Sequence, residues 1–532
     1  MNPIQNSRPC GVSRRTLLKV GLGAGVAGFP LPGIIALAQF KADPFSLGVA
    51  SGDPADDGFV IWTRLAPDPL AFRGGMALAS VVVDWEVAAD PQMKQIVQSG
   101  SAIARVELAH AVHVEVGGLG PARDYFYRFR AGGAESPIGR SRTLPLRGAD
   151  VAQLRFGSAG CQAWENGYYT AWRRIAEENF DFVCHYGDYI YERGWFDPAR
   201  SRLPVARQMP RDFPTCVTLV DYRRRYTLYK GDPDLQAAHA SCPFLPSFDD
   251  HEVLDNWGGD FDPKDTPAEI FRFRRAAAFQ AWYEHMPVRR SLVPRGPDMI
   301  AYRKFRFGNL ADISVLDTRQ YRSKHPCGDG IKAGCAEADE PGRTMMGEQQ
   351  ELWLADGLRN ATATWQILAQ QVAFARLDYG AFEWSPSKET GALNLDAWDG
   401  ASAARDRMLG MLREARAANP VVLTGDSHMG MAVDVRSDWG DPKSTCAVEF
   451  LAPSISSNGD GEQVVPNAQA ILARNPHMRF LGNERGYTRH VVTPQRWQAD
   501  YRVVERVTTP GAPVVTRKSF VVEAGRPGMM DV

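Results

Sequence analysis

An apolar run between Asp181 and Tyr191 constrains the fold of this chain most strongly. The run, Asp-Phe-Val-Cys-His-Tyr-Gly-Asp-Tyr-Ile-Tyr, has the composition of a buried strand and stops abruptly at Gly187-Asp188. A strand that stops in this way delivers a carboxylate to the carboxyl edge of an α/β sheet, where such sheets bind their ligands. Because a Gly-Asp step is also a common turn, the prediction of a site depends on whether other strands end similarly.

Similar strand ends recur after Leu154, where strand-like and helical segments alternate along the chain. This alternation predicts an α/β domain in which neighbouring strands bring polar side chains to one edge of the sheet. The runs that end in such side chains are 154–161 with Cys161, 243–252 with Asp250-His251-Glu252, and 420–428 with Asp426-Ser427-His428. Apolar residues at helical spacing predict helices at 168–178, 267–286, 347–360 and 402–418, and further strands are expected within 313–319 and 448–456.

The region before residue 146 has a different pattern. Short alternating or β-branched runs, at 58–64, 80–86 and 113–116, predict an all-β domain. Residues 116–129 contain a leucine, a Gly-Pro turn and a tyrosine that opens the next strand, which is similar to the final corner of a fibronectin type III-like sandwich. We predict an accessory β-sandwich domain over residues 39–145, a linker at 141–145, and a catalytic domain over residues 146–532.

The N-terminus has the pattern of an export signal. Ser13-Arg-Arg-Thr-Leu-Leu-Lys19 is a twin-arginine motif, an uncharged stretch follows, and Ala36-Leu37-Ala38 is a small-x-small cleavage site. We predict a signal peptide over residues 1–38, export by the twin-arginine machinery, and a periplasmic or secreted mature protein without a transmembrane anchor. The alternative is that the apolar stretch stays as an anchor, because it is nearly long enough to span a bilayer.

The charge of the chain argues against nucleic acid as a partner. The formal net charge is -1, and residues 1–39 contain four cations and no acid, so the remainder carries a net charge of about -5. A protein of this charge, without a long basic patch, is not expected to bind nucleic acid.

The chain has eight cysteines, of which Cys10 lies in the predicted signal peptide. Because the remaining number is odd, at least one thiol stays unpaired in an oxidising compartment. Cys327 and Cys335 flank a short glycine-rich loop and are the best candidates for a disulfide.

Together the strand ends supply one thiol, several carboxylates, one phenol and two histidines. This mixture suits a binuclear or trinuclear site of hard cations, in which a carboxylate can bridge two metals. Each residue also has an ordinary alternative role. The metal site is favoured because all four clusters lie where the chain leaves a strand. The alternatives are a buried apolar thiol for Cys161, a core aromatic for Tyr191, a cap of a helix starting at Val253 for residues 250–252, and a structural role for His428.

The motifs at these strand ends resemble those of binuclear metallophosphoesterases of the purple acid phosphatase type. The opening Asp-x-His motif of those enzymes is absent, and Gly157-Ser-Ala-Gly-Cys-Gln162 stands in its place. With these departures, essentially the whole chain is similar to the alkaline phosphatase D family. The segments that carry this resemblance are Gly187-Asp-Tyr-Ile-Tyr191, Asp250-His-Glu252, Gly425-Asp-Ser-His428, Ser51-Gly-Asp-Pro54, Ile61-Trp-Thr-Arg64, and residues 316–322 and 396–400.

The resemblance implies an α/β (α+β) fold, a metallophosphoesterase-like sandwich of mixed sheets flanked by helices and preceded by the small fibronectin type III-like domain. It also implies Fe(III) and Ca(II) as cofactors, and the residue types agree, because phenolate and thiolate suit ferric iron while carboxylates suit calcium. On this basis we expect Cys161 and Tyr191 to bind iron and Asp188 to bridge the metals. Asp250, Asp426 and His428 are the further expected ligands.

For the reaction, the resemblance implies hydrolysis of phosphomonoesters, phosphodiesters or both, by in-line attack of a metal-bound hydroxide on phosphorus. His251 matches the histidine that helps to protonate the leaving oxygen in related enzymes. Arg319 is expected either to contact phosphate or to form a structural salt bridge. The alternative functions are a phospholipase D-like phosphodiesterase of the same fold, a zinc-dependent hydrolase of another ester, and a non-enzymatic exported binding protein. We expect a monomer.

Overall fold

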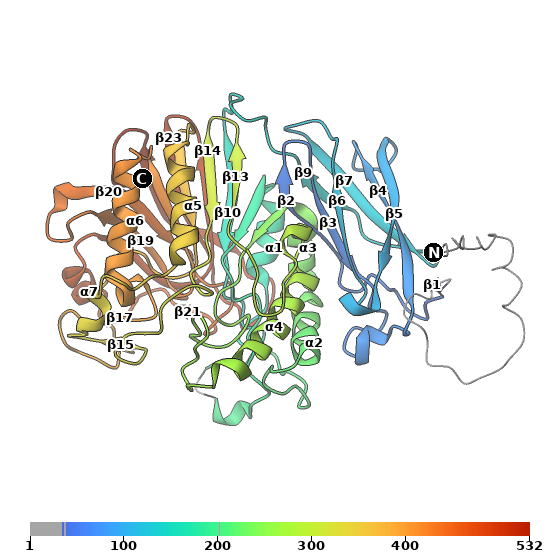
Figure 1. The fold of residues 1–532 in the computed structure, drawn as a ribbon, viewed down its shortest axis with the longest axis horizontal. Coiled ribbons are helices and arrows are strands. Elements are labelled where there is room, and N and C mark those ends of the chain that lie inside the picture. Colours follow the sequence, from blue (N-terminus) through green and yellow to red (C-terminus); the bar gives the residue numbers. More distant parts are fainter. Residues whose placement is uncertain (1–34, 37–38, 202) are drawn as a thin grey trace, which may run out of the picture.

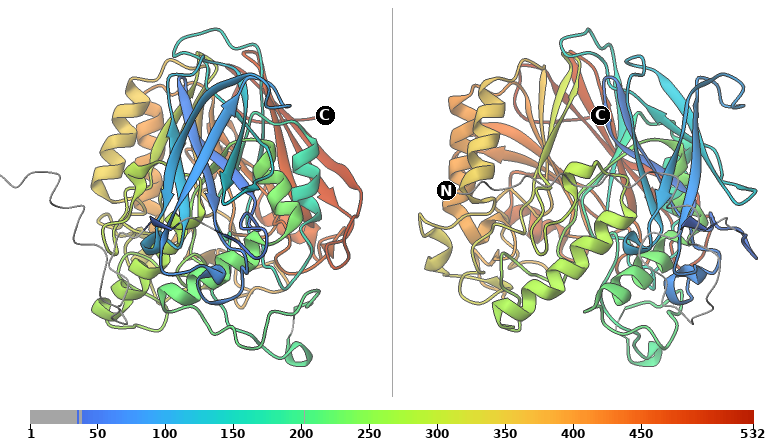
Figure 2. Two further views of the ribbon diagram at one scale, coloured as in Figure 1. Left: turned by 90° about the vertical axis from the view of Figure 1, so that its right-hand side faces the viewer. Right: turned by 45° about the vertical axis from the view of Figure 1, so that its right-hand side comes forward.

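The computed structural model describes residues 35–36, 39–201 and 203–532, and the twin-arginine motif lies outside them. Two large sheets pack face to face, and helices cover the outer face of each sheet. In Figure 2 (left view), the gold helix α5 (Gly347–Arg359) and the orange helix α6 (Ser402–Glu414) lie on one side of the strands, and the teal helix α1 (Thr170–Glu177) lies on the other. The predicted arrangement of mixed sheets flanked by helices is therefore confirmed.

The first sheet has the order β25-β24-β23-β22-β10-β11-β12-β2-β3-β6. Its central strands β10, β11, β12 and β2 are parallel, so their carboxyl ends lie at one edge. The bounds are β2 (Val49–Ala55), β3 (Gly58–Arg64), β6 (Ala111–Val116), β10 (Leu154–Ala159), β11 (Phe182–His185), β12 (Phe244–Pro246), β22 (Met478–Val492), β23 (Arg496–Val504), β24 (Val514–Glu523) and β25 (Met530–Asp531).

The second sheet has the order β13-β14-β16-β18-β20-β19 and joins the first sheet through β22. Here β14, β16, β18 and β20 are parallel. Large apolar side chains such as Phe156, Trp365, Phe450 and Trp497 fill the space between the two sheets. The bounds are β13 (Arg303–Phe307), β14 (Ala311–Val315), β16 (Trp365–Ala369), β18 (Pro420–Thr424), β19 (Gly430–Arg436) and β20 (Thr445–Leu451).

The four predicted helices are present, as α1, α4 (Ala268–His285), α5 and α6. Helices α2 (Leu219–Lys230), α3 (Pro233–Ser241) and α7 (Ala468–Arg474) were not among them. α2 begins with a capping box, in which Thr218 accepts a hydrogen bond from the backbone of Asp221 and Asp221 accepts one from the backbone of Thr218. Among the described residues, no helix is both long enough and apolar enough to cross a membrane.

The N-terminal region forms a sheet of its own that packs on β2, β3 and β6 of the first large sheet (Figure 1). The first large sheet, however, crosses the predicted domain boundary, because its strand β2 pairs with β12. The predicted linker at 141–145 is wrong in part, because Ser141 and Arg142 belong to a strand that pairs with β7. The strands of the N-terminal sheet are β1 (Ile35–Ala36), β4 (Ser80–Ala88), β5 (Ile96–Ala104), β7 (Asp124–Ala131), β8 (Ala134–Glu135) and β9 (Gly139–Arg142).

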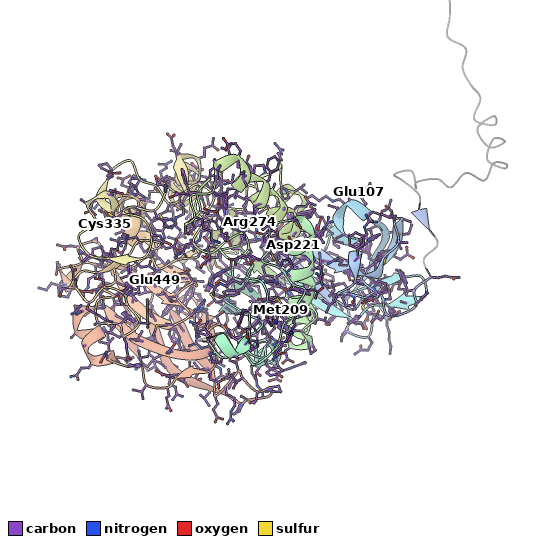
Figure 3. All side chains as sticks on the ribbon, turned by 90° about the horizontal axis from the view of Figure 1, so that it is seen from below. Glu107, Met209, Asp221, Arg274, Cys335 and Glu449 are labelled. Carbon is purple, nitrogen blue, oxygen red and sulfur yellow. A yellow bond between two sulfur atoms is a disulfide. The ribbon has the colours of Figure 1, made fainter. Side chains whose placement is uncertain are left out.

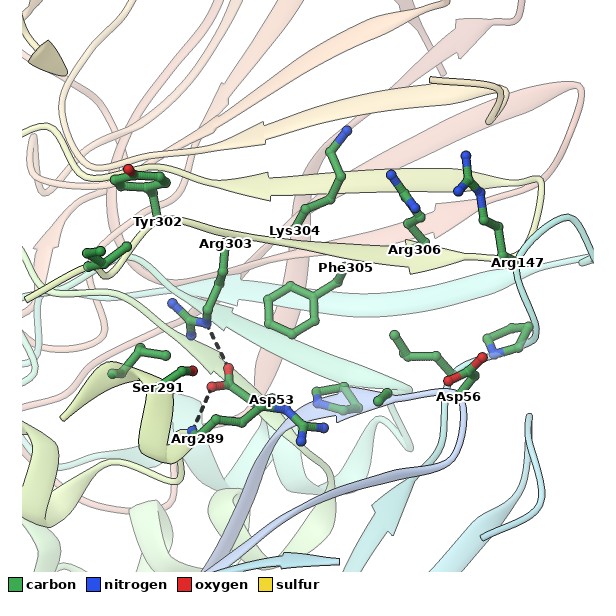
Figure 4. A pocket seen from close by; sticks show the side chains of 16 residues that line it. Asp53, Asp56, Arg147, Arg289, Ser291, Tyr302, Arg303, Lys304, Phe305 and Arg306 are labelled. Atoms are coloured by element: carbon green, nitrogen blue, oxygen red, sulfur yellow. Dashed lines mark hydrogen bonds and ion pairs between the residues drawn. The ribbon is translucent and has the colours of Figure 1, made fainter. Parts of the chain in front are cut away.

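Buried polar contacts also join the N-terminal strands to the rest of the chain. The Trp62 indole donates a hydrogen bond to the carbonyl of Glu284 at the end of α4 (2.9 Å). Asp53 in β2 accepts hydrogen bonds from the side chain of Arg303 (2.8 Å) and the backbone of Arg289 (3.0 Å), as Figure 4 shows. The predicted accessory domain thus shares a sheet and a buried interface with the catalytic region.

The predicted disulfide between Cys327 and Cys335 is present. Cys335 lies far from Glu107 of the N-terminal region (Figure 3). The loop that the disulfide closes contains β15 (Ile331–Lys332). This strand pairs with β17 (Leu393–Asn394), which lies outside the loop. These two strands lie below the large sheets in Figure 1, as does β21 (Gly461–Glu462).

Candidate metal centre

The residues that follow four parallel strands of the two sheets converge into one cluster. β10 leads to Cys161, β11 to Asp188 and Tyr191, β12 to Asp250, and β18 to Asp426 and His428. Because Asp188 and Asp250 each belong to two groups of neighbouring ligand atoms, these groups are continuous. The groups, in each of which the ligand atoms lie within 4.8 Å of one another, are Cys161, Asp188 and His428; Asp188, Asp250 and His251; and Asp249, Asp250 and Asp426.

One end of the cluster contains the thiol and the phenol. Cys161 is buried and forms no disulfide. The Tyr191 hydroxyl donates a hydrogen bond to Asp188 Oδ2 (2.8 Å) and lies 2.8 Å from His428 Nε2 and 2.7 Å from Ser457 Oγ. Cys161 and Tyr191 therefore share Asp188 and His428 as neighbours, as expected of residues that surround one ion.

The other end of the cluster is rich in carboxylates and contains the buried guanidinium of Arg319. Its Nε lies 2.5 Å from Asp249 and its Nη1 lies 2.8 Å from Asp396. Its Nη2 lies 3.5 Å from Asp426 and 3.7 Å from Asp250. These contacts favour the structural salt bridge over direct contact with phosphate, because the guanidinium is already surrounded by carboxylates.

The backbone of the cluster is held in a conformation that non-glycine residues rarely adopt. Cys161, Asp188, Asp426 and His428 have φ values of 57°, 54°, 63° and 57°. Such left-handed residues persist only where the surrounding structure holds them, and they are often found at functional sites. Gly187 has φ 126°, and a Cβ atom there would lie 2.4 Å from the backbone nitrogen of Asp249, so only glycine fits.

The charge state of the cluster fits a bound cation. Burial, reinforced by nearby carboxylates, raises the pKa of Asp188 and of Asp426 well above the usual range. Burial likewise raises the pKa of the Cys161 thiol and of the Tyr191 phenol. Asp188 Oδ1 and Asp250 Oδ1 are buried without a hydrogen-bond partner among the described residues. Cations bound here would pair with these oxygens and offset the cost of burying their charge.

His251 lies in the middle of the cluster. Its Nδ1 is 2.7 Å from Glu192 Oε2, and its ring centroid is 4.1 Å from that of Tyr191. Burial alone would lower the pKa of His251, but the carboxylates of Asp250, Glu192 and Asp188 raise it well above the usual value. The alternative role of residues 250–252 as a helix cap is wrong, because residues 251–256 form turns.

Sequence analysis did not assign several residues that support the cluster. Glu252 accepts hydrogen bonds from the backbone nitrogens of Asp188 (3.0 Å), Tyr189 (2.6 Å) and Asp249 (2.7 Å), and so ties two strand ends together. Asp249 and Glu252 stand beside Asp250-His251, so their position in the motif was an available signal. Ser457 directly follows the strand expected within 448–456, so the same signal of a strand end was available for it as well.

A fourth group of possible ligands, His325, Asp329 and Asp396, lies beside the disulfide loop. Asp396 is 2.6 Å from His325 Nε2 and also forms ion pairs with Arg319 and Arg322 (2.9 Å). Because two guanidinium groups already neutralise Asp396, this group is a poorer cation site than the central cluster.

Comparison with known proteins relates most of the chain to one family. The sequence pattern of the PhoD-like phosphatase family matches residues 156–501, and that of the PhoD-like phosphatase N-terminal domain matches residues 34–145. Alkaline phosphatase D of Bacillus subtilis (strain 168) is 44% identical over 498 residues, which cover 93% of this chain and 84% of that protein. A solved structure of PhoD has a TM-score of 0.89 and 45% identity, and covers 93% of each chain.

A more remote match is the structure of GAP50, the anchor in the inner membrane complex of Plasmodium. It is 13% identical, has a TM-score of 0.35, and covers 69% of this chain and 89% of that chain. A match at this level carries no argument about the present chain. The resemblance to the alkaline phosphatase D family, by contrast, is confirmed: this chain belongs to the PhoD-like phosphatase family and is a phosphoric ester hydrolase.

Proposed function

We propose that this enzyme hydrolyses phosphomonoesters, phosphodiesters or both at the cluster formed by Cys161, Asp188, Tyr191, Asp250, Asp426 and His428. The observation that carries the proposal is the position of Asp188. Its carboxylate contacts the Tyr191 phenol through Oδ2, belongs to the groups of both Cys161 and Asp250, and leaves Oδ1 without a partner among the described residues. A carboxylate in this position is suited to bridge two cations.

The donor types at the two ends support ferric iron and calcium. Cys161, Tyr191 and His428 would hold the iron, because thiolate, phenolate and imidazole suit a transition metal. Asp250, with Asp426 and Asp249, would hold calcium, which prefers carboxylate oxygens. The chemistry that such cations supply to phosphoester hydrolysis is neutralisation of charge on the phosphoryl oxygens and activation of the attacking water.

His251 would supply the proton that the leaving oxygen needs. Glu192 accepts the hydrogen bond from Nδ1, so the second proton of the protonated ring lies on Nε2. Nε2 lies 3.5 Å from Asp255 Oδ1. A ring nitrogen of His251 lies within 4.8 Å of ligand atoms of Asp188 and Asp250, and we place the bound phosphate ester on this side of the ring. Arg319 would act as a positioning residue that holds Asp249, Asp396 and Asp426 in place.

We also propose specific folds for the two regions of the chain and a pathway for its export. The catalytic region, residues 146–532, would be a metallophosphoesterase-like sandwich, and residues 39–145 would form a fibronectin type III-like domain. In support, the Tyr125 hydroxyl accepts a hydrogen bond from the backbone nitrogen of Gly120 (2.9 Å), as a corner tyrosine does. Residues 1–38 would direct export through the twin-arginine pathway to the periplasm or beyond.

One experiment tests the reaction and the metals together. Purified protein is assayed with p-nitrophenyl phosphate and with bis(p-nitrophenyl) phosphate, and the metal content of the same sample is measured. We expect hydrolysis of at least one ester, bound iron and calcium, and loss of activity on chelation that added calcium restores while iron remains. Activity that is indifferent to calcium and returns with zinc alone would refute the iron and calcium assignment.

A further inference from the structure

A cleft of about 500 Å³ opens beside the metal centre. Two of the residues that line it directly follow residues of the centre. Met429 follows His428, and Asn458 follows Ser457, whose Oγ lies 2.7 Å from the Tyr191 hydroxyl. Because consecutive Cα atoms are about 3.8 Å apart, the cleft begins within one residue of the cluster.

The open side of the centre leads toward this cleft. The side chains of Asp426 and His428 are 20% and 19% exposed, whereas that of Asp188 is 1% exposed. Both exposed residues lie in the loop between β18 and β19, which continues into Met429 of the cleft wall. The most exposed ligands of the centre therefore belong to the same loop that supplies Met429 to the cleft wall.

An exposed aromatic platform forms one wall of the cleft. Trp384 is 58% exposed, which is unusual for a side chain of this size. Its ring centroid lies 5.3 Å from that of Phe382 and 6.0 Å from that of Tyr379, and these two rings are buried. The buried rings hold the indole in place, so its exposed surface is available for stacking without reorganisation.

The charged residues that line the cleft are all acidic among the described residues. Glu383 and Glu462 are exposed at its wall, and none of the lysines and arginines that the structure describes lines it. The third acid, Asp460, is occupied by hydrogen bonds from the backbone nitrogens of Val507 (2.6 Å) and Thr508 (2.8 Å). An anionic group in this cleft would be repelled by two carboxylates, whereas a neutral or cationic one would not.

We propose that this cleft binds the alcohol part of the substrate and selects phosphate esters of aromatic or apolar alcohols that carry no negative charge. Trp384 stacks on the alcohol part, and Glu383 and Glu462 exclude anionic alcohols. The proposal rests on the proposed function, because it assigns a specificity to the phosphate ester site described above.

Three phosphomonoesters of phenols with similar leaving ability test the charge preference: phenyl phosphate, O-phosphotyramine, and 3-(4-phosphonooxyphenyl)propanoate. We expect kcat/KM to be higher for the cationic ester O-phosphotyramine and for the neutral phenyl ester than for the anionic propanoate ester. In the double variant Glu383→Gln/Glu462→Gln, kcat/KM for the anionic ester should approach that for phenyl phosphate, because the two repelling carboxylates are gone. An anionic ester that is hydrolysed as well as phenyl phosphate by the wild type would overturn the charge preference.

Trp384→Ala tests the stacking surface. We expect KM for phenyl phosphate to rise roughly threefold to tenfold with little change in kcat, because a ground-state contact to the ring is lost. KM for ethyl phosphate, which has no ring, should not change. Phe273→Ala, which removes a 79% exposed ring on α4, is the matched control and should leave both values unchanged.

Different results would refute the proposed hydrolysis and the proposed role of the cleft. If metal-loaded wild-type protein hydrolyses neither these monoesters nor bis(p-nitrophenyl) phosphate, the proposed function is refuted and the cleft assignment with it. If it hydrolyses them but Trp384→Ala shifts KM for the phenyl and ethyl esters equally, or shifts neither, only the cleft assignment is refuted. If Trp384→Ala does not fold, the charge series in the double variant decides.

Discussion

At the scale of single residues, the proposed chemistry depends on Asp188. Its carboxylate joins the thiol–phenol end to the carboxylate end of the cluster, and its left-handed backbone aims it there. Glu252 fixes this backbone by accepting the hydrogen bond from the Asp188 nitrogen (3.0 Å). The position is therefore determined by a side chain from another strand end rather than by local preference.

Asp188→Asn should lower hydrolysis by roughly 100-fold or more and reduce the content of both metals, because an amide cannot supply the charge that a bridge requires. The measurements are steady-state hydrolysis of p-nitrophenyl phosphate and elemental analysis of the folded variant. Asp265→Asn, which changes a 72% exposed carboxyl group, is the control and should behave as wild type. Full metal content and normal activity in Asp188→Asn would refute the bridging role.

Some of the cluster could be predicted from sequence because its residues come at strand ends. Cys161, Asp188, Asp250 and His428 each stand where an apolar run stops, and parallel strands bring such positions to one edge. Ser457 follows the parallel strand β20, but a serine at a strand end is not a typical metal ligand, so only its contact with Tyr191 (2.7 Å) identified it. Likewise, sequence reasoning left both expected roles of Arg319 open, and its contacts with Asp249 and Asp396 favour the salt bridge.

At the scale of elements, the predicted helices were those with apolar residues at helical spacing. α2 was missed because most of its buried residues carry polar groups, among them Tyr222, Tyr226 and Tyr229 and the buried guanidinium of Arg225. Its start was nevertheless encoded by Thr218 and Asp221, which form the capping box. Capping signals can therefore locate a helix where apolar periodicity is weak.

The turn between β11 and Asp188 should tolerate no side chain at Gly187. Gly187→Ala places a Cβ atom 2.4 Å from the Cβ and the backbone nitrogen of Asp249, so we expect lower thermal stability and loss of metal. Gly410→Ala in α6 is the matched control, because no atom lies within 4 Å of the new Cβ. It should raise the stability by up to about 1 kcal/mol. Equal effects of the two substitutions on the melting temperature would contradict this account of the turn.

At the scale of the whole molecule, the N-terminal region is part of the main sheet. β2 pairs with β12, and Trp62 of β3 is buried against α4. A chain that begins at residue 146 would expose these surfaces, so we expect it to be insoluble or unfolded, as judged by circular dichroism. A folded and active fragment would instead indicate an independent accessory domain.

The same interface should make stability depend on pH through His113. Its Nε2 lies 2.9 Å from the carbonyls of Tyr283 and Met286, and burial lowers its pKa from 6.5 to about 4. Because the folded state favours the neutral ring, this contribution, on the order of 3 kcal/mol, is present above pH 6.5 and is lost as the pH falls toward 4. The difference in melting temperature between wild type and His113→Gln should therefore shrink between pH 7 and pH 4. A constant difference over this range would show that His113 does not titrate in this way.

The most direct test of the account concerns iron at the thiol–phenol end of the cluster. Cys161→Ser removes the thiolate, and Cys184→Ser, at another buried free cysteine, is the matched control. Iron content and visible absorption are measured on folded wild type and on both variants. We expect wild type and Cys184→Ser to contain iron and absorb visible light, and Cys161→Ser to lose both together with most of its activity. Unchanged iron and absorption in folded Cys161→Ser would contradict the proposed centre.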